Sequence, residues 1–174
     1  MKKSSMLLAL TLVLGVFASL MQSSAAVATT AGPDCTDPTS SDLCVASVTH
    51  EDIDNGTSTD ASGATCRTKT IRYLAENFLH VDLWAYFQKV KWCYKGGNIT
   101  SGQRINRWGE VYFPGWEYKG HTGSAISGGK GKNYYRAWTQ GKFQLCLTSC
   151  ILTRLPWVEQ TGWATGSYVP VWSD

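Results

Sequence analysis

Only one stretch of the sequence is apolar over a length that approaches a membrane helix, and it lies near the beginning. It covers residues 6–21, which is shorter than the roughly twenty residues that a membrane-spanning helix needs. Lys2 and Lys3 precede it and small residues follow at 24–28, an arrangement typical of a secretory signal peptide and its cleavage site. We therefore expect residues 1–28 to be a signal peptide. The remaining chain is expected to be secreted and extracellular, without a transmembrane anchor.

The sequence also lacks the usual signatures of catalysis and of metal binding. It contains three histidines but no G-x-S-x-G motif, which holds the nucleophilic serine of many hydrolases in a strained turn. Cys146 and Cys150 are closely spaced, but no second pair of similar ligands lies near them, as a structural zinc site would need. These absences favour a protein that is not an enzyme and that holds no metal or cofactor.

The cysteines predict a framework of disulfides. All six follow the expected signal peptide, and an oxidising compartment favours three disulfide bonds. Among the many pairings that six cysteines allow, we expect the two that close short loops, Cys35–Cys44 and Cys146–Cys150. Cys66 and Cys93 remain for the third bond.

Charge is distributed unevenly along the chain. Residues 27–66 contain several acids and no Lys or Arg, whereas residues 67–174 have an excess of basic side chains. The acidic part is rich in Ser, Thr, Gly and Asp and poor in large apolar residues, so it cannot bury enough surface to fold alone. We expect residues 29–66 to be mostly irregular and residues 67–174 to form the domain. The asymmetry either serves solubility or lets the acidic segment screen a basic face of the domain.

Alternating side chains predict strands after Cys66. Residues 68–74 alternate with a period of two, and residues 79–94 carry apolar side chains on both alternating faces, as a central strand does. A helix is the alternative for residues 75–90, because several apolar residues there also fit helical spacing. We favour the strand because the alternation continues to the "KGGN" stretch at 95–98, which indicates a hairpin turn.

Further strands are expected along the rest of the chain. They cover residues 99–107, residues 109–120 with a bulge at Pro114 and Gly115, residues 133–147, and two strands within 151–172. Residues 121–132 read as a long flexible loop. About seven short strands predict an all-β fold, an antiparallel β-sandwich or barrel stapled by disulfides.

Four blocks of the sequence carry a resemblance to known proteins. In chain order they are "WCYKGGNITS", "WGEVYFPGWEYKGH", "YYRAWTQGKF" and "LPWVEQT". Residues 66–170 resemble a group of small secreted bacterial proteins of the actinomycete type, rich in Trp and Tyr, with WCY-x-G, P-x-W-x-Y and Y-x-x-W-T-Q-G-x-F blocks. The resemblance implies an exported all-β domain and supplies no catalytic residues.

The aromatic content predicts a ligand-binding surface. The chain has eight Trp and eight Tyr, more than a core of this size readily hides. Exposed rings beside basic residues suit stacking on sugars, and export argues against nucleic acid as the partner. We therefore expect a non-catalytic binding module for extracellular polysaccharide or an anionic cell-surface polymer. Its ligand-binding residues would be Arg104, Arg107, Trp108, Trp116, Tyr118 and Lys119.

Two other functions remain open. Glu110 and Glu117 lie among aromatic residues, and a pair of carboxylates is what a glycoside hydrolase uses, although both residues also fit outward positions on a half-exposed strand. A secreted inhibitor or toxin that acts through protein contacts is the third hypothesis. For any single Trp, packing between two sheets is the alternative to a binding role.

Overall fold

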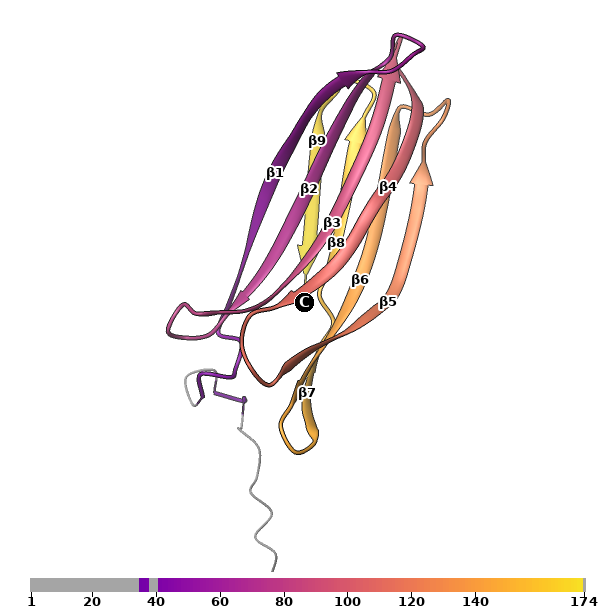
Figure 1. Cartoon of the computed structure of the whole chain (residues 1–174). Helices are drawn as coiled ribbons and strands as arrows, with labels where there is room; N and C mark the ends of the chain where they lie inside the picture. Colours follow the sequence, from indigo (N-terminus) through magenta and orange to yellow (C-terminus); the bar gives the residue numbers. More distant parts are fainter. Residues whose placement is uncertain (1–34, 38–40, 174) are drawn as a thin grey trace, which may run out of the picture. The chain divides into compact units, whose positions relative to one another are not determined.

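The computed structural model describes residues 35–37 and 41–173, and the expected signal peptide lies outside them. The described residues form nine strands and no helix (Figure 1). The strands are β1 (Ser47–Thr59), β2 (Thr65–Glu76), β3 (Asp82–Lys95), β4 (Asn98–Val111), β5 (Trp116–Gly128), β6 (Tyr134–Cys146), β7 (Cys150–Arg154), β8 (Trp157–Trp163) and β9 (Tyr168–Ser173).

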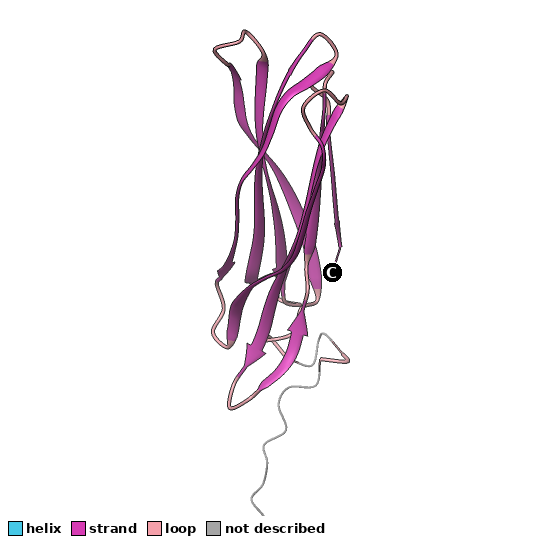
Figure 2. Ribbon diagram, turned by 90° about the vertical axis from the view of Figure 1, so that its right-hand side faces the viewer, coloured by secondary structure: helices cyan, strands magenta, loops and turns pink. Residues whose placement is uncertain are grey.

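The strands build two antiparallel sheets that face each other (Figure 2). The first sheet has the order β1-β2-β3-β4, and the second has the order β5-β6-β8-β9, with β7 also paired to β6. Trp84 of β3 stacks on Phe143 of β6 with ring centroids 4.3 Å apart, so the inner faces share a core. The predicted all-β antiparallel sandwich is confirmed, with nine described strands in place of about seven.

Glycines in the strands let large rings of one sheet approach the backbone of the other. A Cβ at Gly141 would lie 2.7 Å from the Tyr86 ring, and a Cβ at Gly162 would lie 2.3 Å from the Trp92 ring. Gly141 and Gly162 belong to the second sheet, whereas Tyr86 and Trp92 belong to β3 of the first. Glycine in a strand interior often marks such a close approach. Here it explains how a core of bulky aromatic residues fits between two sheets.

The strand expected within residues 75–90 is present, and the helical alternative is wrong. β3 begins at Asp82, whereas Leu79 and Val81 lie in the preceding turn with 60% and 42% of their surface exposed. The hairpin at 95–98 is confirmed, because Gly96 and Gly97 both have positive φ angles, as the favoured two-residue hairpin turn requires.

Pro114 and Gly115 do not form a bulge inside one strand. β4 ends at Val111, and β5 begins at Trp116 in the other sheet, so these residues belong to the turn that carries the chain between sheets. The turn is anchored to β3, because the backbone N–H groups of Tyr112 and Phe113 both donate to the carbonyl of Leu83. Consequently, residues on the two sides of this turn lie in different sheets.

The long loop expected at 121–132 is wrong for most of its length. β5 continues to Gly128 and pairs with β6 as far as Tyr135. Residues 121–128 are largely exposed, because β5 is the edge strand of its sheet, and all of them except Ile126 are small or polar. An edge strand that buries little surface has no apolar alternation, and therefore its sequence resembles a loop.

The acidic segment is not irregular throughout. Residues 47–59 form β1, which pairs with β2 along the edge of the first sheet. Its acids meet the basic side chains of β2: Asp54 lies 3.2 Å from Arg67 and 2.7 Å from Lys69, and Glu51 lies 3.8 Å from Arg72. Composition does not indicate this strand, because the strand is stabilised by its neighbour β2 rather than by apolar burial of its own.

The three disulfides join the pairs expected from the sequence. They are Cys35–Cys44, Cys66–Cys93 and Cys146–Cys150. Cys66 and Cys93 are directly opposed on β2 and β3, and Cys146 and Cys150 bound the tight connection from β6 to β7. The second and third links therefore tie neighbouring strands within each sheet, whereas Cys35–Cys44 closes a loop before β1.

Candidate functional site

The tryptophans divide into buried and partly exposed side chains, and Trp172 of the second group packs against the core. Trp84, Trp92 and Trp116 are buried. The remaining tryptophans keep part of their surface exposed, and they are Trp108, Trp138, Trp157, Trp163 and Trp172. A binding surface for stacked rings must be sought among this second group.

Four rings gather on the outer face of the second sheet, and we call them the aromatic face: Tyr134, Trp138, Trp157 and Trp163. Burial alternates along β6, where the inward residues are buried and Tyr134 and Trp138 are not. On β8, Trp157 and Trp163 are the half-exposed ends of a strand that is buried along much of its length. The pairing of β6 with β8 places Tyr134 opposite Trp163 and Trp138 opposite Glu159.

The aromatic face has polar groups at its centre and rings towards both ends. Tyr134 and Trp163 have ring centroids 5.8 Å apart. Between the two ends, Arg136 lies 3.5 Å from Glu159 and also sits over the Tyr134 ring at 5.7 Å. Trp157 and Trp163 are six positions apart on one strand, which corresponds to about 20 Å. A chain of several sugar rings could lie along such a face.

A smaller group lies on the outer face of the first sheet. Trp108 and Phe87 stack with centroids 4.6 Å apart and planes 1° from parallel. The indole N–H of Trp108 donates to Glu110 Oε1 at 2.8 Å, and the Tyr112 hydroxyl donates to Glu110 Oε2 at 2.7 Å. Arg72 covers the Tyr112 ring at 5.9 Å. We call these residues the Trp108 patch.

The expected platform of Trp108 and Trp116 does not exist. Trp116 is 4% exposed, and its indole N–H donates to the carbonyl of Leu43 at 3.0 Å. The turn at 112–115 separates the two residues, so Trp108 lies on the outer face of the first sheet and Trp116 lies in the core. Trp116 is therefore a core residue, and the expectation that its ring is exposed for stacking on a ligand is wrong.

Arg104, Arg107 and Tyr118 meet at the edge of the sandwich where β4 and β5 lie. Tyr86 and Tyr118 place their hydroxyls 3.0 and 2.9 Å from His121 Nδ1. The other contacts are Tyr86 Oη to Thr139 Oγ1 at 2.9 Å, Arg107 Nη1 to Thr139 Oγ1 at 3.3 Å and Arg104 Nη1 to the Trp138 carbonyl at 3.3 Å. We call these six residues the edge cluster: Tyr86, Arg104, Arg107, Tyr118, His121 and Thr139.

Burial and positive charge set the protonation of the edge cluster. Burial, together with the charges of Arg107 and Arg104, lowers the pKa of His121 below its ordinary value. Burial raises the pKa of Tyr118 and of Tyr86. At neutral pH the imidazole is therefore neutral and both phenols keep their protons, so the cluster presents two guanidinium ions among neutral hydroxyls.

The two glutamates of the hydrolase hypothesis are held separately. Glu110 accepts hydrogen bonds from Trp108 and Tyr112 on the first sheet, whereas Glu117 forms an ion pair with Lys119 on β5. Lys119, expected to bind a ligand, has this carboxylate as its partner. The arrangement provides no feature that favours a pair of catalytic carboxylates.

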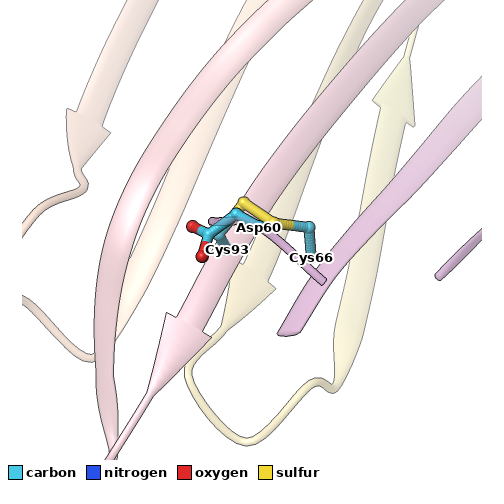
Figure 3. A group of neighbouring side chains, drawn as sticks. All are labelled: Asp60, Cys66 and Cys93. Atoms are coloured by element: carbon cyan, nitrogen blue, oxygen red, sulfur yellow. A yellow bond between two sulfur atoms is a disulfide. The ribbon is translucent and has the colours of Figure 1, made fainter. Parts of the chain in front are cut away.

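One group of possible metal ligands occurs among the described residues: Asp60, Cys66 and Cys93 (Figure 3). The two cysteines form a disulfide, so neither sulfur is a thiolate that could bind a metal. Asp60 Oδ1 accepts hydrogen bonds from the backbone N–H groups of Ser62 and Ala64 and from the Ser62 hydroxyl. The carboxylate therefore stabilises the turn between β1 and β2.

Comparisons with known proteins identify no relative of this chain. No protein-family model, no curated protein and no solved structure matches it. Within the part of the chain that the structure describes, no helix is long and apolar enough to cross a membrane. The arrangement of side chains is thus the main basis for a functional proposal.

The sequence analysis does not predict the aromatic face, although the sequence carries a signal for it. In "YYRAWTQGK", Tyr134, Arg136 and Trp138 alternate with residues that are buried in the structure. The alternation predicts a strand, but it does not indicate that the exposed side of this strand lies next to that of residues 157–163. Only the pairing of β6 with β8 brings the two sets of rings together.

Proposed function

We propose that this protein is a secreted, non-catalytic module that binds an extracellular polysaccharide or cell-wall polymer on the aromatic face. The observation that carries the proposal is the presence of four half-exposed rings on the outer side of two paired strands. They are Tyr134, Trp138, Trp157 and Trp163.

The physical properties of this face suit a sugar polymer. Tyr and Trp offer large apolar surfaces, and because they are anchored on a sheet they lose little freedom on binding. Arg136, Glu159 and Gln140 lie beside the rings and offer polar groups to sugar hydroxyls. A ligand site with apolar walls and a few polar groups that orient the ligand is the usual arrangement in proteins.

Secretion is part of the proposal. The three disulfides are compatible with an extracellular protein, because such bonds persist in oxidising compartments. Membership in the group of small secreted bacterial proteins with the same sequence blocks is likewise proposed. Both parts agree with an expected signal peptide at residues 1–28.

The proposal is tested by depletion of the oxidised mature protein from solution with a panel of insoluble polysaccharides and bacterial cell walls. We expect at least one polymer to remove the protein and to change its Trp fluorescence at both low and high salt, because stacking is not screened by ions. Trp138→Ala and Trp157→Ala should each weaken binding by about 2 kcal/mol, as residues at the centre of an interface do.

Trp108→Ala is the matched control, because it removes the same side chain from the outer face of the other sheet. We expect it to bind as well as the unmodified protein. If Trp108→Ala alone abolished binding, the site would instead be the Trp108 patch. A protein that no polymer depletes would contradict the proposed function.

A further inference from the structure

No carboxylate of the described residues balances the positive charge of Arg104 and Arg107. Among the described residues, Arg67, Arg72 and Arg136 each lie within 4.0 Å of an Asp or Glu, and neither Arg104 nor Arg107 does. Both arginines are half-buried and face the second sheet. Burial, followed by the positive charge of Arg107, lowers the pKa of Arg104.

Hydroxyl groups that can donate hydrogen bonds surround these charges. Thr139 and Tyr86 are hydrogen-bonded to each other, and Thr139 also contacts Arg107. Tyr118 completes the group through His121. Cations flanked by neutral O–H donors form an environment that favours an anion with several acceptor oxygens.

Tyr135 provides an independent observation at the same place. It is 2% exposed, and its hydroxyl is buried without a hydrogen-bond partner. Its ring lies against Gly102 of β4, and its hydroxyl is close enough to Arg104 to interact with the guanidinium charge. A buried hydroxyl without a partner is destabilising. Its position near the unbalanced Arg104 is explained if the site holds an acceptor that the protein itself does not supply.

We propose that Arg104 and Arg107, with the hydroxyls of Tyr135 and the edge cluster, bind a phosphate group. Two guanidinium ions match the double negative charge and the tetrahedral oxygens of a phosphate. A carboxylate carries a single charge and would leave one of the two arginines unbalanced. The site uses different side chains from the aromatic face, so the inference does not depend on the proposed function.

The test is calorimetric titration of the oxidised mature protein with inorganic phosphate at fixed ionic strength, with sodium chloride as the reference. We expect saturable binding at one site and a rise in the thermal midpoint with phosphate. Arg104→Gln and Arg107→Gln should each weaken binding by about tenfold to a hundredfold, since each removes charged hydrogen bonds. Lys130→Gln is the matched control, because Lys130 is exposed in the turn after β5 and lies outside the cluster.

Two conservative variants keep the test decisive if a glutamine variant fails to fold. Arg107→Lys retains the charge but loses the planar fork of donors, and we expect it to bind phosphate several-fold more weakly. Tyr135→Phe should fold and should also bind phosphate more weakly. Unchanged affinity in Tyr135→Phe would overturn the role of that hydroxyl. No binding by the unmodified protein, or an equal loss in Lys130→Gln, would overturn the site.

A phosphate group can come from the free ion or from an ester carried by a larger molecule. Titration with glycerol phosphate, a monoester, distinguishes the two sources. Equal or tighter binding of the ester would assign the site to a phosphorylated partner, whereas binding of inorganic phosphate alone would assign it to the free ion. Either result supports the site, and acetate should not compete with either ligand.

Discussion

The two edges of the sandwich treat charge in opposite ways. At the edge where β1 faces β9, Asp54 is paired with Arg67 and Lys69, and the Tyr168 hydroxyl donates to Asp52 at 3.3 Å. At the other edge, the edge cluster contains Arg104 and Arg107. No carboxylate of the described residues lies within 4.0 Å of either arginine. We call the first the acidic edge.

This difference separates structural from functional charge. The acidic edge satisfies its charges within the fold, and therefore it needs no ligand. The edge cluster keeps two cations without such partners, and the buried Tyr135 hydroxyl near Arg104 also has none, which is costly unless another molecule provides them. Because the fold balances charge at one edge and not at the other, a ligand would add most stability at the edge cluster.

The largest effects on stability are expected for substitutions in the core, which both edges share. Gly162→Ala would place a Cβ 2.3 Å from the Trp92 ring, and Gly141→Ala would place one 2.7 Å from Tyr86. Each should lower the free energy of unfolding by about 1–3 kcal/mol, because overpacking forces the ring and backbone to move. Chemical denaturation measures the loss. Gly97→Ala has open space for a Cβ but a positive φ, so its smaller loss would report backbone strain alone.

A change of about 1 kcal/mol is expected when single hydroxyls are removed from the two edges. Tyr168→Phe breaks the hydrogen bond to the buried Gln160 at 2.9 Å and the one to Asp52. Tyr86→Phe breaks contacts to His121 and Thr139. We expect both variants to be less stable in denaturant and only Tyr86→Phe to alter phosphate binding. An equal effect of Tyr168→Phe on phosphate affinity would remove the distinction between the edges.

The parts of this fold that could be predicted from sequence are those with a local signal. Alternation located β2, β3 and β6, two adjacent glycines located the hairpin after Lys95, and short loops indicated two of the disulfides. Each of these features depends on residues close together in the chain.

The errors concern features that depend on partners far away in the sequence. Pro114 and Gly115 are compatible with a bulge or with a crossing between sheets, and the pairing of β4 with β3 and of β5 with β6 decides between them. Because the chain crosses between sheets at this point, Trp116 lies in the core and not on the surface. The strand in the acidic segment is not predicted for the same reason, because β1 is stabilised by basic side chains on β2.

Acid should weaken the acidic edge in a defined pH range. A hydrogen bond from Lys69 is the largest cause that lowers the pKa of Asp54 from 3.8 to about 2. Because the folded pKa is the lower one, Asp54 stabilises the protein above pH 4, and this contribution is lost as the pH falls towards 2. We expect denaturation measured across this range to show a shallower loss in Asp54→Asn. An unchanged slope would mean that the ion pair is not maintained in solution.

The edge cluster should respond to acid at a higher pH, with the smallest effect of the series. Burial, followed by the charges of Arg107 and Arg104, lowers the pKa of His121 below 6.5. The unfolded chain then binds a proton that the folded protein does not, so stability falls as the pH drops below 6.5. In His121→Gln this part of the pH dependence should disappear. Bound phosphate would oppose the trend, because an anion beside the ring favours its protonated form. A pH titration of stability with and without phosphate therefore tests whether His121 and the two arginines act on the same ligand.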